Sequence, residues 1–203
     1  MARYNGPKAR INRRLNAQIF ENSGAVKAFG RRPQAPGMAR PRGRKSVYGQ
    51  SLAEKQKIKY FYGLGERQIR KFFDKAKRQK GNTGENLLIL CERRFDNVVR
   101  RAGFTRTRPQ ARQGIGHGHF CINGRKNDIA STLLRPGDVI TIHGNEKIQE
   151  MYKQLLTDNG ANNSVSWFSV DPANMSITVL SYPTYEEVAL PVEIEMVIEL
   201  MNR

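Results

Sequence analysis

The sequence is poor in cysteine, in long apolar runs and in signal-like segments, and each shortage excludes a class of protein. Cys91 and Cys121 are its two cysteines, and neither has a Cys or His neighbour at metal-ligand spacing. We expect both to be buried thiols in a reducing compartment. No stretch approaches the roughly 18 consecutive apolar residues of a membrane helix, and the N-terminal residues lack the apolar core of a signal peptide. These absences predict a soluble protein of the cytosol or of its organellar equivalent.

Acidic residues are scarce in the first two thirds of the chain. The whole chain carries 35 Lys and Arg against 18 Asp and Glu, a net charge of +17. Residues 1–80 hold 22 bases and 4 acids, whereas residues 144–203 hold 3 bases and 9 acids. Such an excess indicates a polyanionic partner, nucleic acid first and a membrane surface second. The acidic end either packs against the basic part or faces a different partner.

Residues 1–46 hold 12 Lys and Arg and include the segment FGRRPQAPGMARPRGRKS. Its Pro and Gly residues interrupt both helix and strand. We therefore predict a basic extended arm over 1–46, disordered when alone. The arm is either a solvated linker or a segment that folds onto RNA phosphates as it binds.

Helical periodicity predicts a small helical domain over residues 47–92, joined by the C-terminal residues 188–203. Ser51 and Glu54 have the spacing of a capping box, and Gly63 is suited to ending that helix. A second helix follows with an apolar stripe and bases on its other faces. A third is expected from Thr83 to Gly103, with an arginine-rich exposed side made of Arg93, Arg94, Arg100 and Arg101.

A mixed α/β domain is predicted over residues 93–187. Thr107 can cap a short helix with Pro109 in its first turn, and the glycines of GIGHGH would end it. FCINGRKND reads as a hairpin around Asn123-Gly124, and LRPGDVITI, SVSWFSVD, MSITVLS and EEVALPV as strands. Residues 144–164 are first weakly helical, in EKIQEMYKQLL, and then rich in Asn, Gly and Ser, so we expect an exposed excursion there. The predicted fold class is α+β: a basic N-terminal arm, a small helical domain, and a mixed module of helices packed on an antiparallel sheet with a β-hairpin.

Residues able to support catalysis are isolated from one another. His117 and His119 lack a third metal ligand at a recognised spacing. Asp96, in RFD, faintly resembles the catalytic aspartate motif of pseudouridine synthases, but its place in mid-helix between arginines fits a local ion pair. There is no phosphate-cradling glycine loop and no Ser/His/Asp or Cys/His set. We predict a binding protein with no enzymatic activity, no cofactor and no metal.

Five segments in order carry a family resemblance across nearly the whole chain. They are ARYNGP, YGQSLAEKQKIKYFYGLGERQIRKFF, KGNTGENLLILCERRFDNVVRRAGF, TRPQARQGIGHGHFCINGR and VIELMNR. With these segments the chain resembles the bacterial ribosomal protein S-four family of the small (30S) subunit. In that family, residues corresponding to about 93–142 form the small RNA-binding module of helices and a hairpin.

The resemblance implies a structural constituent of the small ribosomal subunit, cytoplasmic and within the ribosome. It implies a primary rRNA-binding protein that binds the 5′ domain of 16S rRNA, nucleates assembly and contributes to translational accuracy. Implied partners are ribosomal protein S-five and neighbouring small-subunit proteins near the mRNA entry side, and in some bacteria its own operon's mRNA. The expected rRNA-binding residues include bases of the arm. They are Arg3, Lys8, Arg10, Arg13, Arg14, Arg44, Lys45, Lys55, Lys57, Arg67, Arg70, Arg106, Arg108, Arg112, His117 and Asn123.

Two departures from the family pattern stand out. Many relatives bind zinc through cysteines near the N-terminus, whereas residues 1–50 here contain none, which predicts a zinc-free form. Relatives usually carry an aliphatic residue where this chain has Gly114, so the helix is expected to end sooner. Two other readings stay open: an RNA-modifying enzyme with an attached binding module, and a free RNA chaperone or stalled-ribosome rescue factor.

Overall fold

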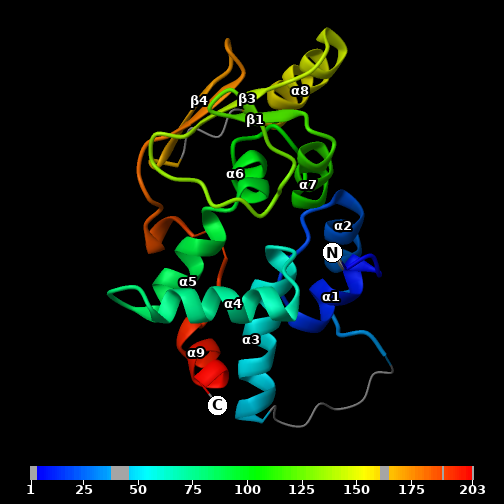
Figure 1. The fold of residues 1–203 in the computed structure, drawn as a ribbon. Helices are drawn as coiled ribbons and strands as arrows, with labels where there is room; N and C mark the ends of the chain where they lie inside the picture. Colours follow the sequence, from blue (N-terminus) through cyan, green and yellow to red (C-terminus); the bar gives the residue numbers. More distant parts are fainter. Residues whose placement is uncertain (1–3, 38–45, 161–164, 189, 203) are drawn as a thin grey trace. The chain divides into compact units, whose positions relative to one another are not determined.

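The computed structural model describes residues 4–37, 46–160, 165–188 and 190–202, and the chain divides into two compact units. Unit 1 comprises residues 1–87 with 189–203, and unit 2 comprises residues 88–188. Figure 1 labels their helices and strands. Each unit has its own buried apolar side chains, so each can be described by itself.

Unit 1 is helical. Its helices are α1 (Lys8–Leu15), α2 (Ser23–Arg31), α3 (Val47–Phe61), α4 (Glu66–Lys77) and α9 (Ile194–Asn202), and α5 (Thr83–Glu92) leads from it into unit 2. α1 contacts α2 and α3, and α9 packs against α3. The backbone N–H of Glu193 donates to the Glu54 carboxylate at 3.2 Å. Residues far apart in sequence therefore complete one helical unit.

The basic N-terminal segment is not an extended arm over residues 4–37, because it contains α1 and α2. Ile11 and Leu15 are buried four residues apart on α1, and Ile19 is buried in the segment after it. The Asn12 side chain accepts from the N–H of Phe20 and donates to the Phe20 carbonyl, both at 3.0 Å. The prediction from charge missed this amphipathic helix, because arginines lie between its buried positions. Residues 38–45 lie outside the described residues.

α3 begins five residues earlier than its sequence predicted. Ser46 is the N-cap, and its side chain accepts from the N–H of Gly49 at 3.2 Å. Ser51 lies inside the helix, where its hydroxyl donates to the carbonyl of Val47 at 3.0 Å. The predicted capping box at Ser51 and Glu54 is therefore wrong, although the helix itself forms.

The predicted third helix is broken in two. α5 ends at Glu92, and α6 runs over Phe95–Arg101 with Arg94 as its N-cap residue. Arg94 pairs with Leu133 in an isolated β-bridge, and its guanidinium binds both Asp96 carboxylate oxygens at 3.0 and 2.7 Å. Arg94 is 1% exposed, so it was wrong to place it on the exposed side. The local ion pair expected at Asp96 is confirmed, with Arg94 as its partner, but it lies at a helix start and not in mid-helix.

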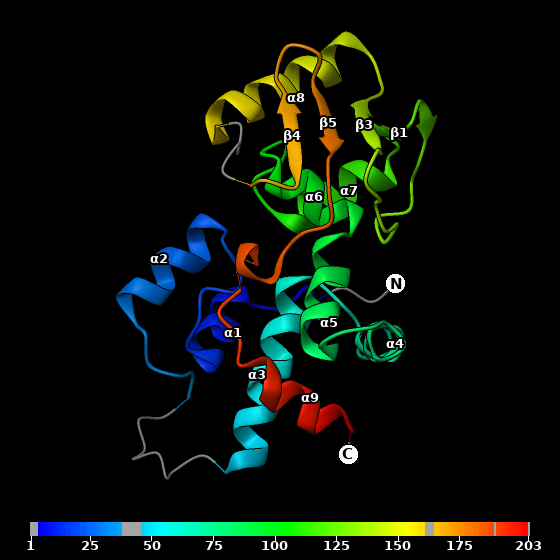
Figure 2. The same cartoon turned by 90° about the vertical axis from the view of Figure 1, so that its left-hand side faces the viewer.

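Unit 2 contains a five-stranded antiparallel sheet in the order β2-β1-β3-β5-β4. Its strands are β1 (Phe120–Ile122), β2 (Arg125–Lys126), β3 (Val139–Ile142), β4 (Phe168–Asp171) and β5 (Ser176–Val179). Figure 2 shows β4, β5, β3 and β1 side by side. Asn123 and Gly124 have φ of 50° and 76°, as a primed hairpin turn requires. The predicted α+β class is confirmed.

Two expectations for unit 2 need correction. EKIQEMYKQLL is helical, as its sequence indicated, and forms most of α8 (Glu146–Asn159), but this helix packs on the unit and is not an exposed excursion, because Tyr152 and Leu156, four residues apart, are both buried. The segment EEVALPV contains no strand in its described part. Tyr185–Glu187 forms a short 3-10 helix (η1), since Glu187 accepts from the Thr184 side chain and backbone.

α7 runs over Arg108–Gly116, and Thr107 caps it by accepting from the N–H of Gln110. The predicted cap and the place of Pro109 are confirmed. The helix continues past Gly114, contrary to the expectation of an early end. A Cβ at Gly114 would lie 2.3 Å from the Tyr152 hydroxyl oxygen, so the missing side chain makes room for α8.

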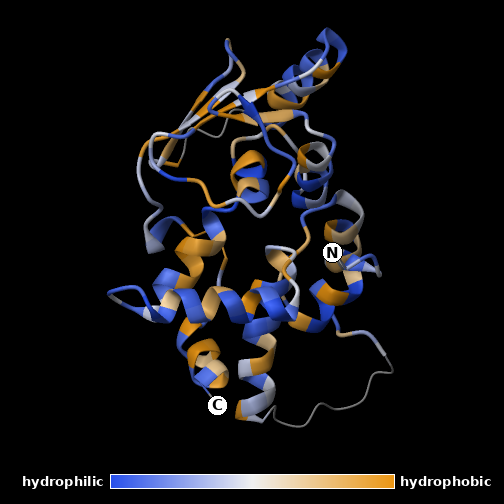
Figure 3. Ribbon diagram, in the orientation of Figure 1, coloured by the Kyte–Doolittle hydropathy of each residue, from blue (hydrophilic) through white to orange (hydrophobic). Residues whose placement is uncertain are grey.

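Buried apolar residues from α6, α7, α8 and the sheet form the core of unit 2. They include Phe95, Ile115, Phe120, Trp167 and Ile177. In Figure 3 hydrophobic colouring follows α6 and the strands, whereas α4 of unit 1 is mostly hydrophilic. The two cysteines are buried as expected, and burial raises the pKa of the Cys91 thiol far above its usual range.

Candidate RNA-binding surface

Exposed bases in unit 1 include arginines on α1 and α4. Arg10 and Arg14 are four residues apart on α1 and exposed, and their helix turns its apolar side inward. Arg67 and Arg70 are exposed at three-residue spacing on α4, whose buried side carries Ile69, Phe73 and Ala76. Both helices therefore hold their apolar faces in the unit and their guanidinium groups in solvent. Arg3, Arg44 and Lys45 lie outside the described residues.

Other predicted contacts in unit 1 already have partners within the protein. Lys55 forms an ion pair with Glu66, and Lys57 pairs with Glu54 at 2.6 Å. The ammonium groups of Lys55 and Lys59 lower the pKa of the Glu66 carboxyl, although burial alone would raise it. The Lys59 ammonium lies 3.1 Å from that carboxylate. These lysines have less positive charge to offer an external anion than Arg10 and Arg14.

Two further bases of α1 contact neighbouring groups of unit 1. The ammonium of Lys8 lies 5.9 Å from the centroid of the Phe20 ring, a cation–π distance. The Arg13 side chain donates from Nε to the Gln34 carbonyl at 2.7 Å. Both side chains are partly buried and held, whereas Arg10 and Arg14 are exposed.

A buried polar network orients the arginines of unit 2. Glu92 is fully buried and accepts from the Asn97 side chain at 2.7 Å and from Arg101 at 2.9 Å. Asn97 in turn accepts from Arg108 Nε at 2.9 Å, and Arg101 also donates to the Glu187 carbonyl at 2.8 Å. Arg101 and Arg108 are thereby fixed by residues that sequence reasoning did not connect. Arg112 is half-buried on α7.

Asn123 and His117 have different roles in the turns. The Asn123 side chain donates to Asp138 at 2.9 Å and accepts from the N–H of Val139 at 2.8 Å, so it shapes the hairpin. His117 is exposed at the end of α7, and its ring stacks with His119 at 5.8 Å between centroids. We therefore keep His117 as a candidate for RNA contact and read Asn123 as primarily structural.

His119 is tied to α8. Its Nδ1 lies 3.0 Å from the Tyr152 hydroxyl. Burial lowers the pKa of His119, and His117 and Lys126 lower it further, whereas burial raises the pKa of Tyr152 to about 12. The hydrogen bond between the His119 ring and the Tyr152 hydroxyl holds the turn after α7 against α8.

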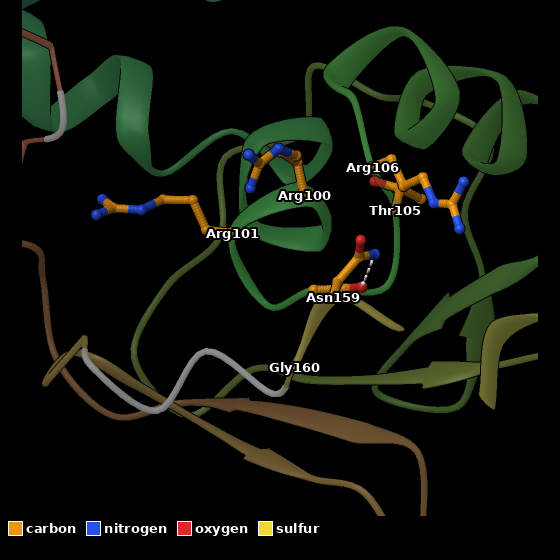
Figure 4. Close-up of a pocket in the computed structure, with 7 residues that line it drawn as sticks. Arg100, Arg101, Thr105, Arg106, Asn159 and Gly160 are labelled. Carbon is orange, nitrogen blue, oxygen red and sulfur yellow. Dashed lines mark hydrogen bonds between the residues drawn. The ribbon is translucent and has the colours of Figure 1, made fainter. Parts of the chain in front are cut away.

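An arginine-lined pocket opens at the ends of α6 and α8, with a volume of about 350 Å³. Arg100 and Arg101 come from the last turn of α6, Thr105 and Arg106 from the segment before α7, and Asn159 and Gly160 from the end of α8. Figure 4 shows Arg101 and Arg106 extending to opposite sides, with Arg100, Thr105 and Asn159 between them. Arg106 pairs with Asp158 at 2.7 Å, and both side chains are exposed. Of the lining residues, only Arg106 was predicted as a site residue.

Within the described residues, no helix combines the length and the apolar content that crossing a membrane requires. The same residues contain no group of three His, Cys, Asp or Glu placed to hold a metal ion. The zinc-free expectation stays a prediction.

Comparison with known proteins shows which family the chain resembles. Residues 3–92 match the ribosomal protein S4/S9 N-terminal domain, and residues 93–140 match the S4 domain. A small ribosomal subunit protein uS4 from Rhodopirellula baltica is 52% identical over 203 residues, covering 100% of both chains. The chain belongs to the uS4 family. Further uS4 proteins, from Rubrobacter xylanophilus and Persephonella marina, are 43% and 42% identical, each over the full length of both chains.

Membership of the uS4 family settles the broad function. The chain is a structural constituent of the small ribosomal subunit, located with the ribosome in the cytoplasm, and its S4 domain is an RNA-binding domain. The uS4 family is one of structural proteins, which agrees with the prediction of no enzymatic activity. The buried Arg94–Asp96 pair gives Asp96 a structural role in place of the catalytic one that RFD suggested.

Proposed function

We propose that this uS4-family chain is a primary rRNA-binding protein that binds the 5′ domain of 16S rRNA and nucleates assembly of the small subunit. The observation that carries this proposal is the arginine arrangement of unit 2. There, the fully buried Glu92 accepts from the Asn97 side chain, and Asn97 in turn accepts from Arg108 Nε, which fixes the direction of the Arg108 guanidinium. Pre-oriented guanidinium groups can match one folded RNA shape, which mobile surface lysines do less well.

Electrostatic attraction alone would not select a folded junction. Binding to phosphates is largely independent of sequence, so selectivity must come from RNA shape and 2′-hydroxyl contacts. The exposed arginines of α1 and α4 supply the general attraction, and the fixed arginines of unit 2 supply the shape requirement. The predicted rRNA-binding residues on the described helices therefore form two groups: one attracts any RNA, and the other selects a folded RNA shape.

The test is equilibrium binding of the full chain to the isolated 5′ domain, with excess unrelated RNA as competitor. The salt series runs up to about 0.3 M, where general phosphate binding fades. We expect saturable one-to-one binding that survives competitor and salt. An equal collapse for both RNAs would contradict the proposal and favour a free RNA chaperone or rescue factor. Copy number is the second readout, because an assembly protein is present once per small subunit.

The proposed assembly role includes further partners. We infer contact with ribosomal protein S-five and neighbouring small-subunit proteins near the mRNA entry side, an influence on translational accuracy, and binding to the chain's own operon mRNA. The mRNA binding would use the same arginines as rRNA binding. Excess 5′-domain RNA should therefore displace the operon mRNA, and simultaneous binding of both RNAs would contradict a shared site.

A further inference from the structure

We propose that Asn123, in the turn between β1 and β2, is a site of spontaneous deamidation, and that its hydrogen bonds to Asp138 and Val139 suppress the reaction while unit 2 is folded. The co-reactant is water, and the products are ammonia and an acid at position 123. The proposal concerns the chemical stability of the chain and does not depend on the proposed RNA-binding function.

The turn has the residues and the exposure that this reaction needs. Asparagine followed by glycine is the most reactive arrangement, because glycine has no side chain to hinder the approach of its backbone nitrogen. The sequence has three such pairs, at 5–6, 123–124 and 159–160. Asn123 and Gly124 are both exposed, and a Cβ added at Gly124 would meet no atom within 4 Å. Water and the attacking nitrogen can therefore both reach the Asn123 side chain.

The reaction proceeds through a cyclic imide. The backbone nitrogen of Gly124 forms a bond to Cγ of Asn123, the Cγ–Nδ2 bond breaks, and Nδ2 leaves as ammonia with the proton from the Gly124 nitrogen. Water then opens the imide at one of its two carbonyl groups. Opening on one side gives aspartate, and opening on the other gives isoaspartate, whose backbone is one carbon longer.

The folded hairpin holds the Asn123 side chain away from this reaction. Its Nδ2 donates to the Asp138 carboxylate at 2.9 Å, and its Oδ1 accepts from the N–H of Val139 at 2.8 Å. Asp138 is itself fixed, because its second carboxylate oxygen accepts from the N–H of Arg135 at 2.7 Å. Both ends of the Asn123 amide must be released before Cγ can turn toward the Gly124 nitrogen. The start of β3 therefore suppresses the reaction.

Either product damages the hairpin. Aspartate at position 123 replaces a donor to Asp138 with a second carboxylate, so a hydrogen bond is lost and two like charges face each other. Isoaspartate lengthens a turn in which Asn123 and Gly124 have φ of 50° and 76° and connect the paired residues Ile122 and Arg125. A chain that deamidates while unfolded therefore refolds with a weakened hairpin.

The first experiment compares the folded full chain with the same chain unfolded in urea. Both are kept at mildly alkaline pH, and peptide mapping by mass spectrometry follows the conversion of Asn123 to acid. We expect unfolding to raise the rate at least about tenfold, because both side-chain hydrogen bonds are lost. Equal rates in the two states, or no reaction in the unfolded chain, would overturn the proposal.

Asp138→Ala isolates the contribution of the carboxylate in the folded chain. We expect the rate at Asn123 to rise about 3- to 10-fold, the kinetic equivalent of one hydrogen bond. Asn159 is an internal reference, because its side chain is held in the same unit by the Gly103 carbonyl at 2.8 Å. Its rate should not change. Equal acceleration of Asn123 and Asn159 would indicate a general loosening of unit 2 and would overturn the role assigned to Asp138.

Asp171→Ala is the matched control variant. Asp171 accepts from the N–H groups of Ala173 and Asn174 in the turn between β4 and β5, so its removal alters a hairpin turn of the same unit without touching Asn123. The rate at Asn123 should stay that of the unaltered chain. An increase as large as that caused by Asp138→Ala would contradict a local effect of Asp138.

The consequence of the reaction is tested with the product itself. Asn123→Asp should lower the equilibrium constant for folding about 3- to 10-fold in urea unfolding, because the bond to Asp138 is lost. Combining Asn123→Asp with Asp138→Asn exchanges the acid and the amide, and should restore most of this loss. A double variant no more stable than the sum of the two single changes would overturn the assigned repulsion.

Discussion

Gly114 shows at the residue scale how a missing side chain positions a neighbouring helix. Its absent Cβ leaves room for the Tyr152 hydroxyl, which reaches His119 at 3.0 Å. Sequence reasoning noticed the glycine but expected a shortened helix, because glycine is unfavourable in mid-helix. The reason it is accommodated lies 38 residues away on α8, and no local pattern around Gly114 reveals it.

We predict that Gly114→Ala destabilises the free protein by about 1–3 kcal/mol through overpacking against Tyr152. In a Tyr152→Phe background the nearest atom is gone, so the same alanine should be neutral or slightly stabilising through its helix propensity. Urea unfolding of the two single variants and the double variant measures this coupling. Additive effects would show that the two residues do not share the space.

At the element scale, the junction of α5 and α6 shows where helix periodicity misleads. The apolar spacing continues through residues 87–102 as though one helix ran through, yet the chain breaks at Arg93 and Arg94. The break is imposed by a bridge to Leu133 and by the buried pair with Asp96, both of which depend on tertiary contacts. By contrast, the Thr107 cap and the Asn123-Gly124 turn were predictable, because their chemistry is local.

Replacing Asp96 by Asn should destabilise unit 2 by about 3 kcal/mol, because Arg94 then loses its bidentate carboxylate while remaining buried. Asp128→Asn, the same change at an exposed position of this unit, is the matched control and should have little effect. Chemical denaturation followed by circular dichroism provides the measurement. Equal midpoints for the two variants would mean that the Arg94–Asp96 pair does not hold the junction.

At the scale of the whole molecule, net charge indicated the class of partner but not which bases are available to it. Lys55 and Lys57 have carboxylate partners, Arg13 is held by a backbone carbonyl, and Arg10 and Arg14 are exposed. The pocket at Thr105 was beyond sequence reasoning, since it joins segments more than 50 residues apart. Composition therefore indicated a polyanionic partner, whereas the fold is needed to tell which bases are exposed and which are paired.

The structure also changes how the N-terminal contribution should be tested. Deleting residues 1–46 would remove α1 and its buried Ile11 and Leu15, so a loss of binding would be ambiguous. We predict that the double variant Arg10→Gln and Arg14→Gln lowers the slope of log affinity against log salt by about 2 for any RNA. The matched variant Lys55→Gln and Lys57→Gln should lower it by less, because Glu66 and Glu54 already neutralise these lysines. Equal slopes for the two double variants would contradict this division.

The pairing of α3 with α9 also orders events during synthesis of the chain. Unit 2 is continuous in sequence, so all of its residues have been made before the α9 segment is translated. Unit 1 needs residues 189–203, and its Glu54–Glu193 bond joins positions 139 residues apart. α3 must therefore wait for its last helical neighbour while a complete S4 domain is already available to fold. The domain with pre-oriented arginines can thus be ready first, and the helical unit is completed only after the α9 segment has been translated.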